Sequence, residues 1–148
     1  MKKRAFVIAS VLALSIMAAA QVALAQDSMV VNIPFAFVAG NAALPAGEYR
    51  VQKSDRDSSV LLIHCSDPTA AAFVVTMPAQ QKRDWQTESK LVFNRYGNRY
   101  FLSQVWTAGY RQGRQLSKSP REKELAQSAR LETKGEITLV ARLSPARP

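Results

Sequence analysis

The sequence predicts an all-β protein: an antiparallel sandwich or small barrel of about seven strands, with one short surface helix near the C-terminus. Segments typical of strands recur about every ten residues, turn residues separate them, and a clear helix-start signal stands near residue 120. With 148 residues, of which 47% are hydrophobic and 21% charged, the chain has the size and composition of one globular domain.

The first 25 residues have the pattern of a secretory signal peptide. Met1-Lys2-Lys3-Arg4 is basic, Ala5 to Ala20 holds no charged residue, and Ala23-Leu24-Ala25 places small residues before the expected cut. This pattern predicts export by a Sec-type route to the periplasm or the outside, and it leaves residues 26–148 as a single β-rich domain. A retained N-terminal anchor is the alternative, because about 20 apolar residues can span a bilayer.

Residues 29–38 predict the first strand. The odd-numbered residues from Met29 to Phe37 are all apolar, which is the period of a strand with one buried face. Pro34 lies on the other face and has no N–H group for pairing, so we expect an edge strand or a bulge here. Turns are expected at residues 39–41 and 44–47.

The next strands are expected at residues 48–52, 59–65 and 70–77. A polar hairpin loop at 54–58 separates the first two, and Asp67-Pro68 turns the chain before the third. Residues 79–88 are polar apart from Trp85 and predict a loop.

Residues 90–96 and 99–106 predict a hairpin, because Gly97-Asn98 is a strong two-residue turn signal. A turn of this length places Arg95 opposite Tyr100. Neither face of the pair is cleanly apolar, so the register further along stays open. Residues 107–118 are expected to form a polar loop.

The helix is expected from Pro120 to about Leu131. Ser119 at the N-cap, Pro120 at the first helical position and Glu122 three residues after the cap form a capping box. Its apolar stripe is thin, so we expect it on the surface. A last strand follows at residues 136–143, and the helical excursion lets it return to a non-neighbouring position.

Residues 32–51 resemble the opening of a family of small, exported, β-rich bacterial proteins without an assigned activity. They contain Pro34-Phe35-Ala36-Phe37, then Gly40-Asn41, and then Leu-Pro-Ala-Gly-Glu-Tyr-Arg-Val from Leu44 to Val51. The resemblance, which includes the later Tyr-Gly-Asn hairpin, implies an exported β-rich domain and brings no functional residues with it. The last run is also similar to the hairpin entry of transthyretin-like β-sandwich domains, where it reports a turn that feeds a strand.

Few side chains are available for nucleophilic or metal chemistry. The chain has one histidine, His64, and one cysteine, Cys65, which excludes an intrachain disulfide, a thiolate zinc cluster and a multi-histidine site. Neighbours on a strand point to opposite faces, so these two cannot form a dyad. We expect Cys65 to be a small core residue, and an interchain disulfide is the alternative.

The acidic residues also lack the pattern of a site. Asp55 and Asp57 flank Arg56 without the glycine and closing glutamate of a calcium loop, which favours a solvated hairpin loop. The other carboxylates fall in turns, loops or the surface helix, and no spacing brings two together as glycoside hydrolysis requires. We therefore expect no catalytic residues, no metal and no cofactor.

A basic and aromatic segment is the best candidate for a binding surface. Aromatic faces stack on sugar rings, and guanidinium groups pair with carboxylate, sulfate or phosphate. The alternative is that the aromatic rings fill the core and the arginines cover them. The candidate residues are Arg95, Tyr96, Arg99, Tyr100, Phe101, Trp106, Tyr110, Arg111 and Arg114.

Charge and export together indicate the class of partner. The net charge is +9, or +6 once residues 1–25 are removed. For an exported protein this favours an anionic envelope glycan or another envelope protein over nucleic acid, and no membrane span is expected after signal cleavage. The leading hypothesis is a non-enzymatic binding or structural module of the cell envelope. The alternatives are a carrier that encloses a small apolar ligand in a lipocalin-like barrel and a small hydrolase. The oligomeric state is left open.

Overall fold

The computed structural model describes residues 28–67, 69–80, 84–128 and 134–144, which contain ten strands and one helix. The expected signal peptide lies outside the described residues. The strands are β1 (Ser28–Ile33), β2 (Phe37–Ala39), β3 (Ala42–Leu44), β4 (Gly47–Lys53), β5 (Val60–Cys65), β6 (Ala71–Pro78), β7 (Ser89–Tyr96), β8 (Arg99–Trp106), β9 (Arg114–Leu116) and β10 (Lys134–Ser144), and the helix is α2 (Pro120–Ser128).

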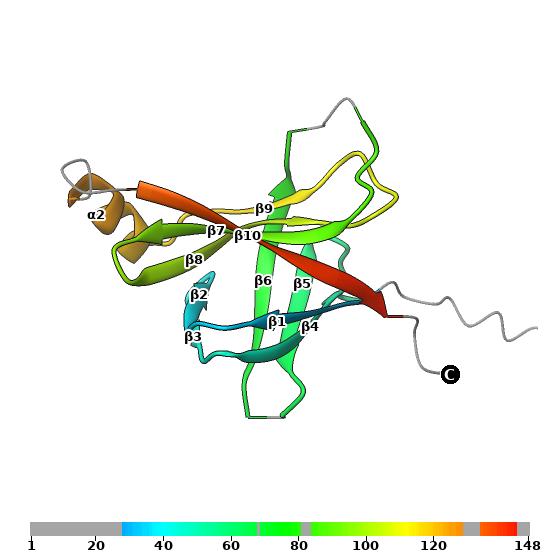
Figure 1. The fold of residues 1–148 in the computed structure, drawn as a ribbon, viewed down its shortest axis with the longest axis horizontal. Coiled ribbons are helices and arrows are strands. Elements are labelled where there is room, and N and C mark those ends of the chain that lie inside the picture. The colour runs from blue at the N-terminus through cyan, green and yellow to red at the C-terminus, as the bar shows by residue number, and fades with distance from the viewer. Residues whose placement is uncertain (1–27, 68, 81–83, 129–133, 145–148) are drawn as a thin grey trace, which may run out of the picture.

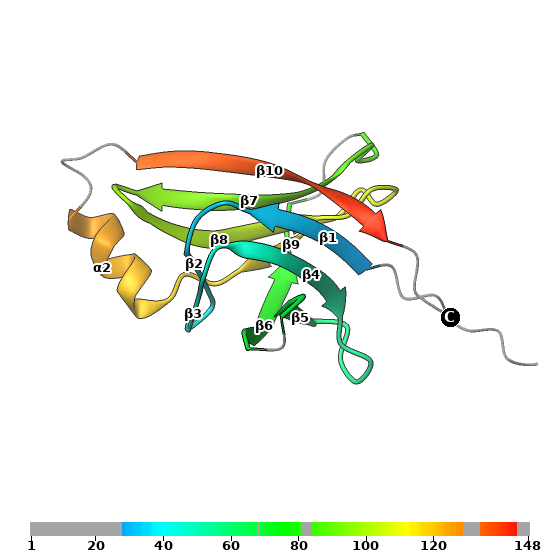
Figure 2. The same ribbon diagram turned by 60° about the horizontal axis from the view of Figure 1, so that its bottom comes forward.

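Eight of these strands form a closed antiparallel barrel. Its order is β8-β7-β10-β1-β4-β5-β6-β9, and pairing of β9 with β8 closes it. The short strands β2 and β3 are added outside this ring, where β2 runs parallel to β8. Figures 1 and 2 show α2 at one end of the barrel, which we call the helix end. The opposite end, where residues 54–59 and 107–113 connect strands, is called the loop end. The expected all-β barrel with one short helix is confirmed.

The chain breaks at Pro34, where the sequence predicts one continuous strand. Pro34 lacks the N–H group that would continue the ladder, so β1 ends at Ile33 and the chain bends before β2 begins. The two halves then join different partners, because β1 lies between β4 and β10 while β2 pairs with β8 and β3. The expectation of an edge strand is therefore wrong for β1, although its alternation is confirmed, with Met29, Val31 and Ile33 all buried.

Inward-facing side chains fill the middle of the barrel. These residues come from all eight barrel strands and belong to one continuous apolar cluster. Their side chains occupy the interior of the barrel at mid-height. The largest of them, each less than 2% exposed, are Tyr49, Phe93, Ile33, Ile63, Leu91 and Val51.

Tyr49 ties the turn before β4 to the core. Its ring is fully buried, and its hydroxyl donates a hydrogen bond of 2.7 Å to the carbonyl oxygen of Pro45. The ring also packs edge-on against Phe37, with centroids 5.2 Å apart. The motif that carries the family resemblance therefore has a structural role here, because its tyrosine locks the turn that its proline begins.

The β7–β8 hairpin forms at Gly97-Asn98 as predicted. Gly97 has a φ of 60°, and Arg95 lies opposite Tyr100. Further along, Val92 pairs with Gln104 and Phe93 with Leu102, so Ser103 is an extra residue in a bulge. Both faces of the hairpin carry buried apolar residues because both are covered.

The outer face of the hairpin is covered at two places. Near the helix end, Tyr96 lies against α2 through a hydrogen bond described below. Near the loop end, Val92 and Trp106 form a second buried cluster with Ala79, which follows β6. Cover on both sides explains why the hydrophobic pattern did not fix the register.

Two short strands, β3 and β9, occur where the sequence predicts only a turn and a polar loop. Each has three residues, too few to show a period. Pairing supplied by the rest of the fold makes them strands: β3 follows β2 through the Gly40-Asn41 turn, and β9 fills the gap between β6 and β8. The last expected strand, 136–143, is confirmed within β10.

We expect Tyr49→Phe to lower the free energy of unfolding by about 1 kcal/mol, because the carbonyl of Pro45 loses its buried donor while the ring stays in place. Chemical denaturation measures this loss. Tyr110→Phe is the matched control, since Tyr110 is 45% exposed, and it should leave stability unchanged. Equal effects of the two substitutions would contradict the assigned role of the Tyr49 hydroxyl.

Candidate functional site

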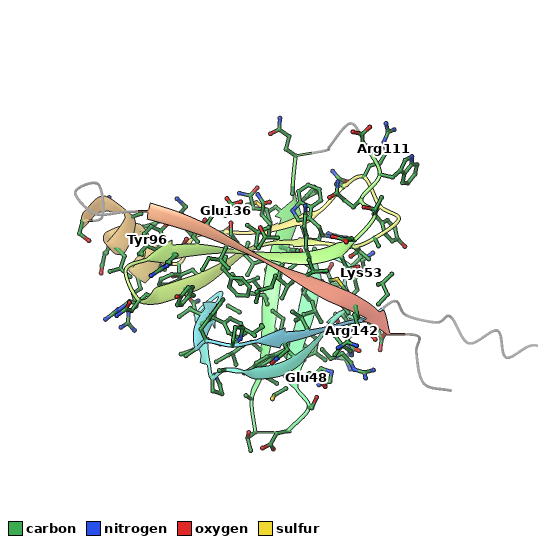
Figure 3. All side chains as sticks on the ribbon, in the orientation of Figure 1. Glu48, Lys53, Tyr96, Arg111, Glu136 and Arg142 are labelled. Atoms are coloured by element: carbon green, nitrogen blue, oxygen red, sulfur yellow. The ribbon has the colours of Figure 1, made fainter. Side chains whose placement is uncertain are left out.

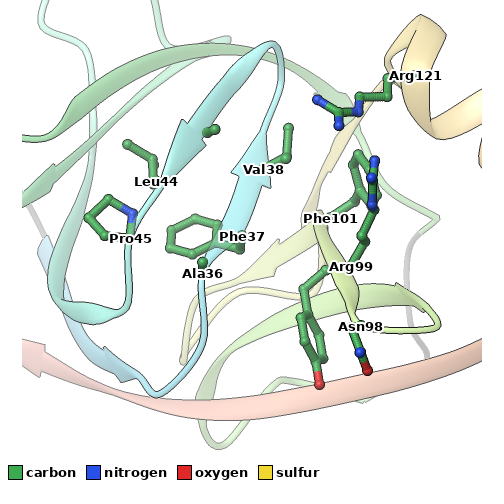
Figure 4. Close-up of a pocket in the computed structure, with 11 residues that line it drawn as sticks. Ala36, Phe37, Val38, Leu44, Pro45, Asn98, Arg99, Phe101 and Arg121 are labelled. Atoms are coloured by element: carbon green, nitrogen blue, oxygen red, sulfur yellow. The ribbon is translucent and has the colours of Figure 1, made fainter.

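A cleft at the helix end is the candidate site to which two arginines contribute. It has a volume of about 400 Å³ and lies outside the barrel wall, between β2 and β3 on one side and β8 and α2 on the other. Figure 4 shows Phe37, Val38 and Leu44 along one side and Phe101 along the other. Phe37, Leu44 and Phe101 are almost fully buried, so the cleft has firm apolar walls.

Two arginines reach this cleft from separate elements. Arg99 begins β8 directly after the Gly97-Asn98 turn, and Arg121 is the second residue of α2. Both side chains are exposed, and Figure 4 shows them on the same side of the cleft as Phe101. None of the residues that line the cleft is acidic. Two guanidinium groups without a competing carboxylate attract a carboxylate, sulfate or phosphate group.

The position of Arg121 depends on how α2 begins. The Ser119 hydroxyl accepts a hydrogen bond of 3.2 Å from the Glu122 backbone N–H, and the Ser119 carbonyl accepts one of 3.0 Å from Lys123. The predicted N-cap is thus confirmed. The Glu122 side chain, however, does not complete a reciprocal capping box at Ser119.

Glu122 is instead buried against the barrel and holds the helix there. It is 4% exposed, and its Oε1 accepts hydrogen bonds from Asn94 Nδ2 at 2.9 Å and from the Tyr96 hydroxyl at 3.2 Å. It is the one buried residue within α2. The helix is therefore docked by a polar contact, where the sequence suggested only a thin apolar stripe. We call this contact the Glu122 latch.

The latch changes the acidity of Tyr96. Burial, the neighbouring negative charge of Glu122 and the hydrogen bond to it raise the pKa of Tyr96 to about 12. Tyr96 therefore stays a neutral donor over the whole physiological range. Its role in this structure is to anchor α2, and through α2 to place Arg121.

The structure separates the residues of the predicted binding surface. Arg99, Tyr100 and Phe101 line the cleft. Arg95 turns back on its own hairpin: its Nε donates a hydrogen bond of 2.8 Å to the Gly97 carbonyl, and its guanidinium lies 5.8 Å from the ring centroid of Tyr100.

Trp106 is a core residue of the second cluster. It is 3% exposed, and its Nε1 donates a hydrogen bond of 3.0 Å to Gln104 Oε1. Its contact with Gly113 is so close that a Cβ added there would lie 2.7 Å from the indole ring. For Trp106, as for Tyr96, the alternative of an aromatic core role is the one observed.

Tyr110, Arg111 and Arg114 lie at the loop end, far from Arg99. Figure 3 shows Arg111 and Lys53 at that end and Tyr96 near α2. The Arg111 guanidinium lies 5.5 Å from the ring centroid of Trp85, and Lys53 Nζ lies 5.0 Å from that of Tyr110. Tyr110 and Arg114 line a second hollow there.

The other candidate groups make contacts that stabilise the fold. Cys65 is free and half-buried, and it packs against the core next to half-buried His64. The Asp57 carboxylate accepts hydrogen bonds from the hydroxyl and the backbone N–H of Ser59, at 2.7 and 2.8 Å, which lower the pKa of Asp57. Within the described residues, no three His, Cys, Asp or Glu side chains gather as metal ligands would.

Sequence reasoning missed Arg121 and the far wall of the cleft. Arg121 was assigned to the helix, and only the buried Glu122 next to it decides that it faces β8.

Comparisons with protein-family models, curated proteins and solved structures gave no match. The described part of the chain also contains no helix of the length and hydrophobicity needed to cross a lipid bilayer.

We expect the Tyr96 contribution to stability to be present below pH 10 and to be lost as the pH rises towards 12, because the folded state keeps the phenol neutral above its ordinary pKa of 10.0. Glu122→Gln keeps an acceptor and removes the charge, so it should lower the pKa of Tyr96. The ultraviolet absorbance of phenolate follows the ionisation of the tyrosines. The step at the highest pH is assigned to Tyr96 if it is missing in Tyr96→Phe. An unchanged late step in Glu122→Gln would contradict the latch.

Proposed function

We propose that this protein is an exported, non-enzymatic binding module of the cell envelope whose cleft at the helix end takes an anionic group of an envelope glycan. The observation that carries the proposal is the pair Arg99 and Arg121, which reach one apolar-walled cleft without an acidic lining residue. Export rests on the pattern of residues 1–25, which lie outside the described residues.

The shape of the cleft suits a charged sugar. A guanidinium fork binds a carboxylate or sulfate through two parallel hydrogen bonds. Beside it, the exposed Pro45 and the half-buried Val38 and Tyr100 offer apolar surface to one face of a sugar ring. A volume of about 400 Å³ lies within the range of small-molecule pockets. It leaves room for about two sugar units, with the rest of a polymer outside.

The lining residues favour binding over hydrolysis. A glycosidase needs two carboxyl groups across the scissile bond, and an acyl hydrolase needs an activated nucleophile. The cleft is lined by neither carboxylate, histidine nor cysteine. The nearest glutamate in sequence, Glu122, is used in the latch. These facts support the proposal of binding at this cleft, where a small hydrolase would find no carboxylate, histidine or cysteine.

The lipocalin-like carrier has less support than the cleft. A carrier of that kind holds its ligand inside the barrel, whereas here Tyr49, Phe93 and Leu91 occupy the interior at mid-height. The hollow at the loop end is open to a small molecule at the mouth of the barrel.

We expect Arg99→Ala/Arg121→Ala to weaken binding to a polyuronate or sulfated glycan by about tenfold or more, because two charge-assisted contacts are lost. Calorimetry with purified protein, and retention on cell-wall and outer-envelope fractions, measure the effect. Arg56→Ala/Arg142→Ala removes the same charge from exposed positions elsewhere.

The control separates a specific cleft from general attraction between a basic protein and a polyanion. If both double variants lose affinity equally, net charge explains the binding and the cleft does not. If neither loses affinity, or if the native protein binds neutral and anionic glycans alike, the proposal is wrong.

A further inference from the structure

We propose that the mouth of the barrel at the loop end is a second binding site, for one medium-chain amphipathic carboxylate. The hollow there has a volume of about 300 Å³ and is a separate feature from the cleft, because the two share no lining residue. At the roughly 30 Å³ that a water molecule occupies in the liquid, it holds about ten non-hydrogen atoms.

The floor of the hollow is the apolar top of the barrel core. Met29 and Val51 lie side by side there, as register partners on β1 and β4. Leu61 on β5 and Val105 on β8 complete the floor, and all four residues are at most 4% exposed. An alkyl chain placed on this floor loses its contact with water, which is the main source of affinity for such a ligand.

The rim of the hollow is polar and carries more positive than negative charge. Lys53 and Arg114 line it, against one carboxylate, Asp55, which already interacts with a neighbouring group. Asp57 stands in the same loop; Ser59 donates two hydrogen bonds to its carboxylate, and the charge of Arg114 also acts on it. A ligand carboxylate therefore meets Lys53, together with Arg114, which it shares with Asp57, above an apolar floor. This is the arrangement that an amphipathic anion requires.

Lys53 and Tyr110 also shape the entrance. Lys53 Nζ lies 5.0 Å from the centroid of the Tyr110 ring, and this cation–π contact holds the ammonium group at the mouth. Tyr110 comes from the loop between β8 and β9, and Lys53 ends β4. The head group of the ligand is thus placed at the rim, and its chain points down towards Met29 and Val51.

Nuclear magnetic resonance titration with octanoate tests the site directly. We expect amide signals of residues around Lys53, Leu61 and Val105 to shift, with a Kd on the order of 100 µM for a ligand of about ten non-hydrogen atoms. Octanol, which lacks the charge, and octylammonium, which reverses it, should bind about tenfold more weakly. Acetate, which lacks the chain, should cause no shift at the floor.

Variants separate the two halves of the site. Thr107→Trp and Ser58→Trp each place a large ring at the rim and should abolish octanoate binding, whereas Thr69→Trp, at an exposed position between β5 and β6, should not. Lys53→Met should weaken octanoate to the level of octanol, and Lys123→Met, exposed on α2, should have no effect.

The proposal is overturned if octanoate shifts no signal at the mouth, or if both tryptophan variants at the rim bind it as the native protein does. Equal binding of octanoate, octanol and octylammonium overturns the choice of an anion. Octanoate binding should persist in Arg99→Ala/Arg121→Ala, so the result is independent of the glycan cleft.

Discussion

An aromatic cluster that extends from the middle of the barrel towards the helix end joins five separate segments of the chain. Its rings come from the bend after β1, from β2, from β4 and from both strands of the β7–β8 hairpin. Each contact between such rings contributes about 0.5–1.5 kcal/mol beyond the burial of its area. The members are Phe35, Phe37, Tyr49, Phe93 and Tyr100.

This cluster explains why the chain tolerates the break at Pro34. The bend turns Phe35 towards the barrel end, where its ring stacks on Tyr100 with centroids 3.9 Å apart and meets Phe93 edge-on at 5.3 Å. The same bend sends β2 outside the ring of strands to β8. The cleft wall formed by β2 and β3 therefore exists because a proline interrupts a strand and the next residue, Phe35, packs partly buried against the core.

Local signals made much of the fold predictable. The alternation around Met29, the Gly97-Asn98 turn and the Ser119 cap each specify structure within a few residues, and each is observed. The strands β3 and β9 were missed because their pairing is decided by distant segments. For the same reason the site was only partly anticipated. Arg99 and Tyr100 were expected, whereas Arg121 is placed by Glu122, a buried polar residue that hydrophobic patterns cannot reveal.

The residues of the predicted binding surface lie at both ends of the barrel for a geometric reason. Strand β8 runs the length of the barrel, so its first and last residues, Arg99 and Trp106, lie roughly 23 Å apart at about 3.3 Å per residue. Residues that are close together in the sequence therefore lie at opposite ends of the barrel. Aromatic and basic residues in a hairpin consequently indicate one binding surface only if they come from the same end of its strands.

The pairing of β1 with β10 sets the order of events in folding. Val30 lies opposite Arg142, so the first and last described strands meet as neighbours. During synthesis, β1 can pair with β4 early, but its other edge must wait until almost the whole chain has been made. Contacts this distant in sequence form slowly, and until then β1 and β7 each have an open edge that could pair with another molecule. Unfinished chains are therefore most exposed to pairing with one another just before β10 forms, and a factor that keeps them apart matters most at that stage.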